Sequence, residues 1–251
     1  MLGIERRQII TSILQKNKKV LVSDLRKQFN VTEETIRRDL EKLEREGALT
    51  RTYGGAVINQ PTNLDLPFNQ RIDINLQIKQ EIAQKASLYI SDNDSLFVDS
   101  SSTCFELVKL LNDKRNVTVI TNSVKILNER SNTTNKIIST GGELVPHSLS
   151  LVGAISLETA KKYNPDYAIL SCNGLDQTKG IMDSNEPDAE LKKFMAQQAN
   201  KNILLADHTK FDNIAFISFL EFQKIDYLIT NIKPSDNWIK FLHENNITVI
   251  Y

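Results

Sequence analysis

Residues 31–43 decide the fold of the N-terminal part of this chain, with the sequence Val31-Thr32-Glu33-Glu34-Thr35-Ile36-Arg37-Arg38-Asp39-Leu40-Glu41-Lys42-Leu43. Ile36, Leu40 and Leu43 recur at helical spacing, which predicts a helix that buries this stripe. Thr32 is the expected N-cap, and Val31 is placed to pack against Ile36 across the first turn. The outward face then carries hydrogen-bonding and charged groups: Thr35, Arg38 and Lys42, flanked by Glu34 and Arg37.

Two shorter helical patterns precede this helix, and a glycine-rich segment follows it. Apolar residues recur at helical spacing within 4–14, and Ser23 is the expected N-cap of a helix over residues 24–29. Gly47 is expected to end the 31–43 helix, and residues 48–58 predict two short strands joined by a glycine turn. This arrangement predicts a winged helix-turn-helix, a fold that places a recognition helix in the major groove of DNA.

Charge is distributed unevenly along the chain. The whole sequence has 31 Lys and Arg against 31 Asp and Glu. Residues 1–59 contain 12 basic and 8 acidic residues, so this segment carries +4 and the remainder carries −4. A small basic module on an acidic body indicates that a polyanion binds at one end only.

The 31–43 stretch, together with Gly47 and Gly54-Gly55-Ala56, resembles the signature of the DeoR family of bacterial repressors. The family usually has His where this chain has Tyr53. An isolated Arg37-Arg38 pair most often only solvates a helix, but the wing and the extended match favour DNA binding. The pattern and the resemblance together assign these DNA-contacting residues: Ser23, Thr32, Glu34, Thr35, Arg37, Arg38, Lys42, Arg51, Tyr53 and Gly54.

A polar, proline-punctuated run from Gln60 to Pro67 marks a domain boundary. We therefore expect a DNA-binding domain over residues 1–58, a linker over 59–76 and a larger domain over 77–251. In the larger domain short apolar strands alternate with helical patterns. This alternation predicts an α/β, Rossmann-like domain in which helices cover both faces of a mostly parallel sheet.

The expected elements of this domain follow from its apolar runs. Strands are expected at 96–98, 117–120, 136–138, 168–170, 202–205, 227–229 and 247–250. Helices are expected at 78–90, 105–111, 124–130, 155–163, 189–199 and 236–245. Ligands of such sheets bind beyond the carboxyl ends of the strands, so the loops there are the candidate site.

These loops again resemble the DeoR family, whose C-terminal domain is similar in fold to ribose-5-phosphate isomerase and binds sugar phosphates as effectors. The resemblance carries a phosphate loop onto Ser101, Ser102 and Thr103, and a phosphate-facing lysine onto Lys210. It carries further effector contacts onto Asp99, Asn122, Gly142, Gly174 and the acidic Glu190. Taken singly, each of these positions is more often an ordinary loop or surface residue.

The family commonly has Gly-Thr where this chain has Ser101-Ser102. If that glycine has a positive φ, a serine in its place costs strain or reshapes the loop. The shape of this loop is therefore left open by the sequence.

Two rival functions start from the same residues. One is a sugar-phosphate isomerase in which Glu190 is the proton-transfer base and Lys210 its electrostatic partner. The loop over residues 171–176, Ser-Cys-Asn-Gly-Leu-Asp, lacks the paired-acid motif of that enzyme, so we expect no catalysis. The other is a DNA-architectural protein without a ligand, which is disfavoured because the larger domain exceeds what dimerisation of a winged helix needs.

The remaining expectations concern cofactors, compartment and assembly. Cys104 and Cys172 lack CxxC spacing and the three histidines are scattered, so we expect no disulfide, metal or cofactor. No apolar run reaches the ~20 residues that span a bilayer, and the N-terminus lacks a signal-peptide core. We therefore expect a cytoplasmic protein with no membrane partner. Two-fold operators favour a homodimer or homotetramer.

Overall fold

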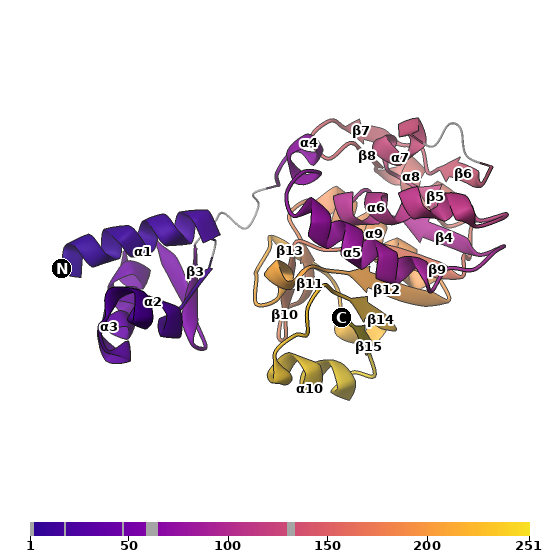
Figure 1. Cartoon of the computed structure of the whole chain (residues 1–251). Helices are drawn as coiled ribbons and strands as arrows, with labels where there is room; N and C mark the ends of the chain where they lie inside the picture. The colour runs from indigo at the N-terminus through magenta and orange to yellow at the C-terminus, as the bar shows by residue number, and fades with distance from the viewer. Residues whose placement is uncertain (1–2, 18, 47, 59–64, 130–133) are drawn as a thin grey trace. The chain divides into compact units, whose positions relative to one another are not determined.

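The computed structural model describes residues 3–17, 19–46, 48–58, 65–129 and 134–251. The chain divides into two compact units, Met1–Pro61 and Thr62–Tyr251. Each unit is built around hydrophobic clusters of its own, so each is described by itself (Figure 1).

The N-terminal unit is a winged helix-turn-helix. Its elements are α1 (Gly3–Asn17), β1 (Lys19–Leu21), α2 (Val22–Phe29), α3 (Glu33–Arg45), β2 (Leu49–Thr52) and β3 (Gly55–Ile58). The strands form an antiparallel sheet in the order β1-β3-β2. The predicted stripe of α3 is confirmed, because Ile36, Leu40 and Leu43 are buried in one cluster with Ile10 and Leu14 of α1.

The predicted cap of α3 is confirmed, whereas the predicted cap of α2 is wrong. The hydroxyl of Thr32 accepts the Thr35 N–H at 3.2 Å. Helix α2 begins at Val22, because Leu21 ends a strand that pairs with β3 and leads directly into the helix. Ser23 therefore lies inside the first turn, where its hydroxyl donates to the Asp24 carboxylate. Gly47, the expected end of α3, lies outside the described residues.

The second unit, which we call the sensor unit, is an α/β domain. Its helices are α4 (Phe68–Arg71), α5 (Leu76–Ser87), α6 (Ser102–Leu110), α7 (Val124–Glu129), α8 (Ala154–Ala160), α9 (Glu186–Gln198) and α10 (Asp236–Glu244). None of the helices in the described part of the chain combines the length and the apolar character needed to cross a membrane.

The main sheet of the sensor unit has seven parallel strands. They are β4 (Ser95–Val98), β5 (Thr118–Thr121), β6 (Lys136–Ser139), β9 (Tyr167–Ser171), β12 (Lys201–Leu205), β14 (Tyr227–Ile229) and β15 (Thr248–Ile250). Their order is β15-β14-β12-β9-β4-β5-β6. The first strand, β4, lies beside β9, and the chain builds outward from this pair in both directions. This is the doubly wound order of a Rossmann-like domain, so the predicted fold class is confirmed.

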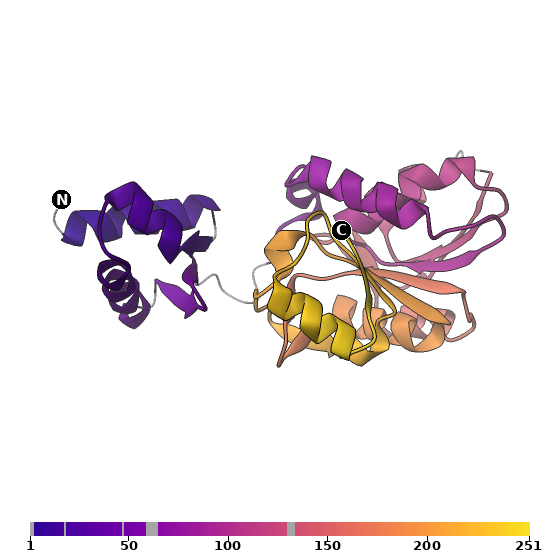
Figure 2. The same ribbon diagram turned by 60° about the horizontal axis from the view of Figure 1, so that its bottom comes forward.

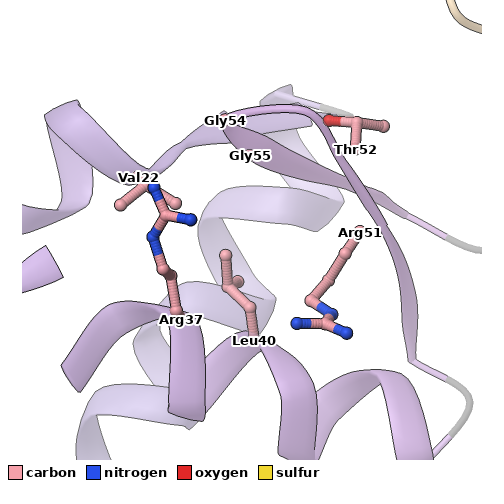
Figure 3. Close-up of a pocket in the computed structure, with 7 residues that line it drawn as sticks. All are labelled: Val22, Arg37, Leu40, Arg51, Thr52, Gly54 and Gly55. Carbon is pink, nitrogen blue, oxygen red and sulfur yellow. The ribbon is translucent and has the colours of Figure 1, made fainter. Parts of the chain in front are cut away.

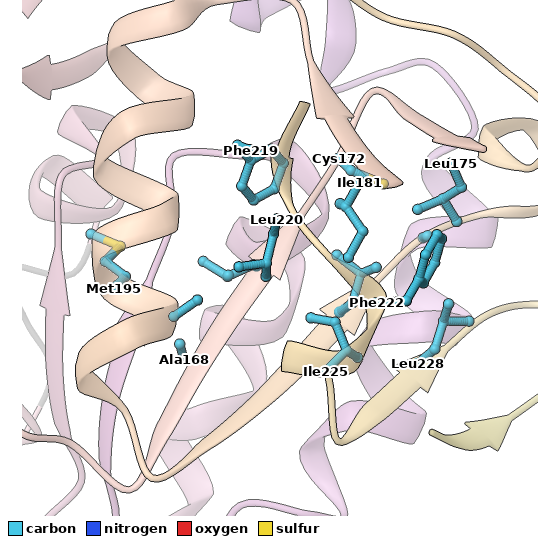
Figure 4. Packing of buried hydrophobic residues seen from close by; sticks show 14 of the residues in the cluster. Ala168, Cys172, Leu175, Ile181, Met195, Phe219, Leu220, Phe222, Ile225 and Leu228 are labelled. Atoms are coloured by element: carbon cyan, nitrogen blue, oxygen red, sulfur yellow. The ribbon is translucent and has the colours of Figure 1, made fainter. Parts of the chain in front are cut away.

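Helices cover both faces of this sheet, as Figures 1 and 2 show. Successive strand residues point to opposite faces. Leu96 and Val98 of β4 are therefore buried against α5 and α6, whereas Phe97 belongs to the cluster formed with α9 and α10. Part of the latter cluster is drawn in Figure 4. The inner strands β4, β9 and β12 are buried along most of their length and contain short apolar runs, which is the signal that made them predictable.

Several elements of the sensor unit were not expected from the sequence. They are the hairpin of β7 (Glu143–Val145) and β8 (Ser150–Val152), and a small antiparallel sheet of β10 (Gly174–Asp176), β11 (Gly180–Asp183) and β13 (Ile217–Leu220). Helix α4 lies within the expected linker. Its Phe68 is 1% exposed and packs into the core, so the folded unit begins before residue 77.

Candidate functional site

The candidate DNA surface is the outward face of α3. Arg37, Arg38 and Lys42 are exposed on it, as the spacing predicted, and Thr35 is half-buried near the N-terminus of the helix. Its arginines lie beside glutamates of the same helix. The Arg38 guanidinium is 3.1 Å from the Glu34 carboxylate, and Arg37 is 3.6 Å from Glu33. Such exposed pairs hold the side chains only weakly, so a DNA phosphate or base edge can replace the glutamate.

The wing is fixed to α3 through Arg51. The Arg51 N–H donates to one oxygen of Glu44 at 2.8 Å, and the Arg51 side chain donates to the other oxygen at 2.6 Å. These bonds, the backbone one first, lower the pKa of Glu44 below its usual range. At the tip Tyr53 is fully exposed, and the following Gly54 has a φ of +91°. The Gly54 carbonyl accepts the Val22 N–H at 2.8 Å, which ties the turn to the start of α2.

A hollow of about 280 Å³ lies between the recognition helix and the wing (Figure 3). Its lining includes two arginines, one from each side, and the glycines of the wing turn: Val22, Arg37, Leu40, Arg51, Thr52, Gly54 and Gly55. Guanidinium groups that lie near the backbone of a glycine turn are suited to bind the oxygens of a DNA phosphate. The sequence-predicted residues Arg37, Arg51 and Gly54 thus meet at one place.

An ion pair that the sequence analysis missed supports α3 from behind. Asp39 is 4% exposed, and its carboxylate accepts the Arg6 side chain at 2.5 Å, with Arg7 at 3.5 Å. Asp39 is three residues after Ile36 and therefore lies on the buried stripe. That spacing was the available signal: an acidic residue on a core face needs a buried partner.

The candidate effector site lies at the carboxyl ends of β4 and β9, the pair at which the sheet reverses its winding. Asp99, directly after β4, is fully buried and joins the two strands. Its carboxylate accepts the Ser101 N–H and the Ser171 N–H, each at 2.8 Å. A crevice at such a switch point is where doubly wound sheets bind ligands.

Lys192 of α9 completes this centre and was missed from the sequence. Its ammonium group donates to Asp183 at 2.6 Å, to the Ser171 carbonyl at 3.0 Å and lies 3.1 Å from Asp99. Burial alone would lower the pKa of Lys192, but Asp183 and Asp99 outweigh it and raise the pKa. Burial likewise opposes ionisation of Asp99, yet Lys192 and the two N–H bonds lower its pKa. These three partners account for the three hydrogens of the ammonium group, so Lys192 holds the surrounding residues in position.

The serine loop opens helix α6. The Ser101 hydroxyl caps the helix by accepting the Cys104 N–H at 3.1 Å. Ser101 has a φ of −73°, so no serine strain arises at the position where the family has glycine. The next N–H groups, of Ser102 and Thr103, belong to a first helical turn, which has no intrahelical acceptors for them. An anion at this helix end would meet free donors and the positive end of the helix dipole.

Asn122 and Asp188 form a polar pair beside this loop. The Asn122 amide donates to Asp188 at 3.3 Å, and the Asn122 side-chain oxygen is buried without a hydrogen-bond partner in the described residues. Burial raises the pKa of Asp188, opposed by Lys192 and by the hydroxyl of Ser150. The acidic side chain that α9 directs into the site is therefore Asp188, whereas the expected Glu190 is exposed. Two residues along a helix turn the side chain by about 200°.

Lys210 lies at the same edge of the sheet, in the turn after β12, and is half-buried. Close to it is Lys79 of α5, which the sequence analysis did not single out. Lys79 is 6% exposed. Burial, and next the charge of Lys210, lower the pKa of Lys79 to about 8. The Lys79 ammonium donates to the Arg71 carbonyl, and the Arg71 Nε is buried without a hydrogen-bond partner in the described residues.

Gly142 and Gly174 are explained by packing. A Cβ on Gly142 would collide with the Val152 carbonyl and the Ser156 hydroxyl, and Gly142 has a φ of +110°. A Cβ on Gly174 would collide with the Asn213 carbonyl. Both positions thus need glycine for close backbone approach.

The comparisons with known proteins agree with this geometry. The model of the DeoR-like helix-turn-helix domain matches residues 6–62, and that of the DeoR C-terminal sensor domain matches residues 74–232. The chain is 40% identical to the uncharacterized HTH-type transcriptional regulator YulB of Bacillus subtilis, over 99% of this chain and 96% of YulB.

Two further relatives are named for their regulatory role. The L-fucose operon activator of Haemophilus influenzae is 32% identical over 98% of both chains. The HTH-type transcriptional repressor GlcR of Bacillus subtilis is 30% identical over 98% of this chain and 95% of GlcR. Among solved structures, ribose 5-phosphate isomerase A of Methanocaldococcus jannaschii aligns at 14% identity over 55% of each chain, with a TM-score of 0.41.

Proposed function

The chain belongs to the DeoR family of transcriptional regulators, and from this premise we propose that it represses a carbohydrate-utilisation operon and is controlled by a phosphorylated sugar. The observation that carries the proposal is the pairing of two sites in one chain. One unit presents an exposed basic recognition helix. The other has hydrogen-bond donors and lysines, which suit a phosphate group, at the switch point of a parallel sheet.

The DNA side of the proposal rests on Arg37, Arg38, Lys42 and Arg51. The first three lie exposed on one helix, and Arg51 of the wing lines a hollow together with Arg37. Guanidinium groups suit both bidentate guanine contacts and phosphate contacts. A helix-turn-helix buries little surface alone, and we propose that the operator binds a homodimer or a homotetramer. We also propose that the protein acts in the cytoplasm, where it would meet operator DNA.

The effector side rests on the two chemically different ends of the site. The first turn of α6 and the lysines Lys79 and Lys210 offer donors and cations, which suit a phosphate dianion. Asn122 and Asp188 offer acceptors, and the Asn122 oxygen is free to accept from a sugar hydroxyl. A phosphorylated sugar carries both kinds of group, whereas inorganic phosphate and a free sugar each match only one end.

An isomerase is the second candidate, and the structure gives a reason against it. Its proposed base, Glu190, is exposed. Asp188, which does reach the site, is held by Asn122 and by the hydroxyls of Ser148 and Ser150. We therefore propose that the sensor unit binds its sugar phosphate without converting it.

The test uses two variants of the full chain with crossed readouts. Duplexes are first selected by the wild-type chain from a random pool. Arg38→Ala should bind the selected duplex at least ~5-fold more weakly, because a base-edge contact contributes about 1–3 kcal/mol. The same variant should keep the rise in melting temperature that a pentose or hexose phosphate gives the wild type.

Lys210→Ala should show the reverse pattern, with the duplex bound normally and the melting-temperature rise lost. Lys193→Ala, on an exposed lysine of α9, is the matched control and should keep both activities. If no phosphorylated pentose or hexose raises the melting temperature of the wild type, the effector assignment is wrong. A reporter operon transcribed less in a deletion strain would show activation instead of repression.

A further inference from the structure

Residues 65–71 form a short segment, here called the strap, that lies across the sensor unit. It contains α4 and is the first described part of the chain after the winged helix-turn-helix. The Phe68 ring packs edge-on against Phe105 of α6, with ring centroids 6.1 Å apart. The Phe68 N–H donates to the His147 carbonyl at 2.9 Å, and the His147 ring bonds to the Asp65 carbonyl.

These attachments border the candidate effector site. Phe105 belongs to the helix whose first turn is the serine loop, and His147 immediately precedes Ser148, which with Ser150 contacts Asp188. Ser100, Ser101, Ser102 and Thr103 are between 4% and 7% exposed, and Asn122 is 3% exposed. A ligand therefore reaches these groups only when a neighbouring element moves. The strap is such an element, because it is short and is joined to the rest of the unit through Phe68, the contact between His147 and Asp65, and Arg71.

The fourth attachment of the strap is the bond from Lys79 to the Arg71 carbonyl. Two cations, Lys210 and Arg71, and two acids, Asp207 and Glu106, act on Lys79, and at each step in order of size the cation has the larger effect on its pKa. Burial and these like charges disfavour its ammonium form, and its pKa falls accordingly. A neutral carbonyl compensates a buried ammonium only in part, whereas a phosphate dianion compensates it well. An anion that enters this site therefore competes for Lys79 with the strap.

We propose that Lys79 couples effector binding to the strap: the anionic group of the effector draws the Lys79 ammonium away from the Arg71 carbonyl and so releases residues 65–71 from the sensor unit. This inference rests on the proposed function and adds the means of regulation to it. The mechanism meets the thermodynamic requirement for a switch, because the anion interacts differently with the clamped and the released strap.

Amide hydrogen exchange of the full chain, read by mass spectrometry, tests the coupling. The probes are inorganic phosphate and glucose 6-phosphate, with chloride at equal ionic strength as the reference. Either phosphate compound that raises the melting temperature should speed exchange over residues 66–72 at least ~10-fold, as expected for opening of a local unit. Exchange in β9 and β12, at the centre of the sheet, should stay unchanged.

The decisive variant is Lys79→Met, which removes the clamp but keeps the length of the side chain. Without any anion it should already show the fast exchange over residues 66–72, and phosphate should add nothing. Lys85→Met is the matched control. Lys85 lies on the same helix and also donates to backbone carbonyls, those of Thr230 and Asn231, away from the strap. In Lys85→Met the rate of amide exchange over residues 66–72 should equal that of the wild type.

The outcomes separate the coupling from the proposed function. If glucose 6-phosphate raises the melting temperature but leaves exchange over residues 66–72 unchanged, the coupling is wrong and the effector site stands. If neither this compound nor any other sugar phosphate binds, both are wrong. Should Lys79→Met fail to fold, Lys79→Arg decides the question: this variant keeps a cation, so its strap must stay protected and must open with the anion.

Discussion

At the scale of single residues, each unit is organised by a buried carboxylate. Asp39 joins α3 to α1 through Arg6, and Asp99 joins β4 to β9 and to Lys192. A buried ion pair contributes little net stability over an apolar pair, yet removal of one partner is costly because the other charge stays buried. These residues therefore hold the two sites in shape.

Asp39→Asn should destabilise the N-terminal unit by about 3 kcal/mol or more, because it leaves the Arg6 guanidinium buried without a counter-charge. Arg6 is 8% exposed, so solvent cannot replace the lost carboxylate. The chain has a single tryptophan, Trp238, in the sensor unit, so its fluorescence reports that unit alone. Urea unfolding should show part of the circular dichroism signal lost at lower urea, with the fluorescence midpoint unchanged.

Asp24→Asn is the control for this measurement, since Asp24 is exposed and bonds only to its neighbour Ser23 in the described structure. Its unfolding curves should overlay those of the wild type. Equal curves for Asp39→Asn and the wild type would mean that the Arg6 pair does not hold the helices together.

The residues that the sequence predicted well are those whose role follows from their own helix or strand. Ile36, Leu40 and Thr32 are read from local spacing, and the structure confirms their burial or capping role. Lys192 and Lys79 could not be found in this way, because their partners lie on other elements and come together only in the folded sheet. Glu190 was preferred to Asp188 for the same reason: the phase of α9 against the sheet is set by tertiary packing.

At the scale of elements, the seven parallel strands were predictable and the smaller sheets were not. The inner strands β4, β9 and β12 contain continuous apolar runs because both of their faces are buried. Strands such as β7, with Glu143 and Leu144 exposed, lack this signal. The strand order β15-β14-β12-β9-β4-β5-β6 was also beyond the sequence, because it depends on pairing between distant segments.

The recognition helix and the wing act as one element, since Glu44 holds Arg51 by both its backbone and its side chain. Glu44→Gln should weaken binding to the selected duplex by about fivefold, corresponding to about 1 kcal/mol. The physical reason is that a charged double acceptor becomes a neutral single acceptor, which leaves the wing less well ordered before DNA arrives.

Glu41→Gln is the matched control for the wing. Glu41 lies on the same helix and pairs with Arg45 at 2.6 Å, and it makes no hydrogen bond to the wing in the described part of the chain. A gel-shift titration should give this variant an affinity equal to or above that of the wild type, because it only removes a negative charge. If both variants bind alike, Glu44 has no special role in placing the wing.

At the scale of the whole molecule, the two units differ in charge and in task. The first 59 residues carry +4 and the rest carries −4, although the chain as a whole is neutral. The acidic sensor unit therefore does not compete with the winged helix-turn-helix for the DNA backbone. Both the division into units and this asymmetry were visible in the sequence, because composition is averaged over many residues and does not depend on tertiary contacts.

The charge asymmetry predicts how operator binding responds to salt. Four candidate cations, Arg37, Arg38, Lys42 and Arg51, lie on the DNA surface of one unit. If each neutralises one phosphate, log K should fall with log[salt] at a slope of about −3.6 per bound chain, and about twice that for a dimer, because each contact releases ~0.9 counterion.

Substitution of one lysine in each unit then tests which unit gives rise to this salt dependence. Lys42→Gln should make the slope shallower by about one per bound chain, since one phosphate contact is lost. Lys240→Gln removes an exposed lysine from α10 of the sensor unit and should leave the slope unchanged. Fluorescence anisotropy of a labelled duplex at several salt concentrations measures all three slopes. If log K of the wild type does not change with salt, or if both variants lower the slope equally, the basic face of α3 is not the surface that binds DNA.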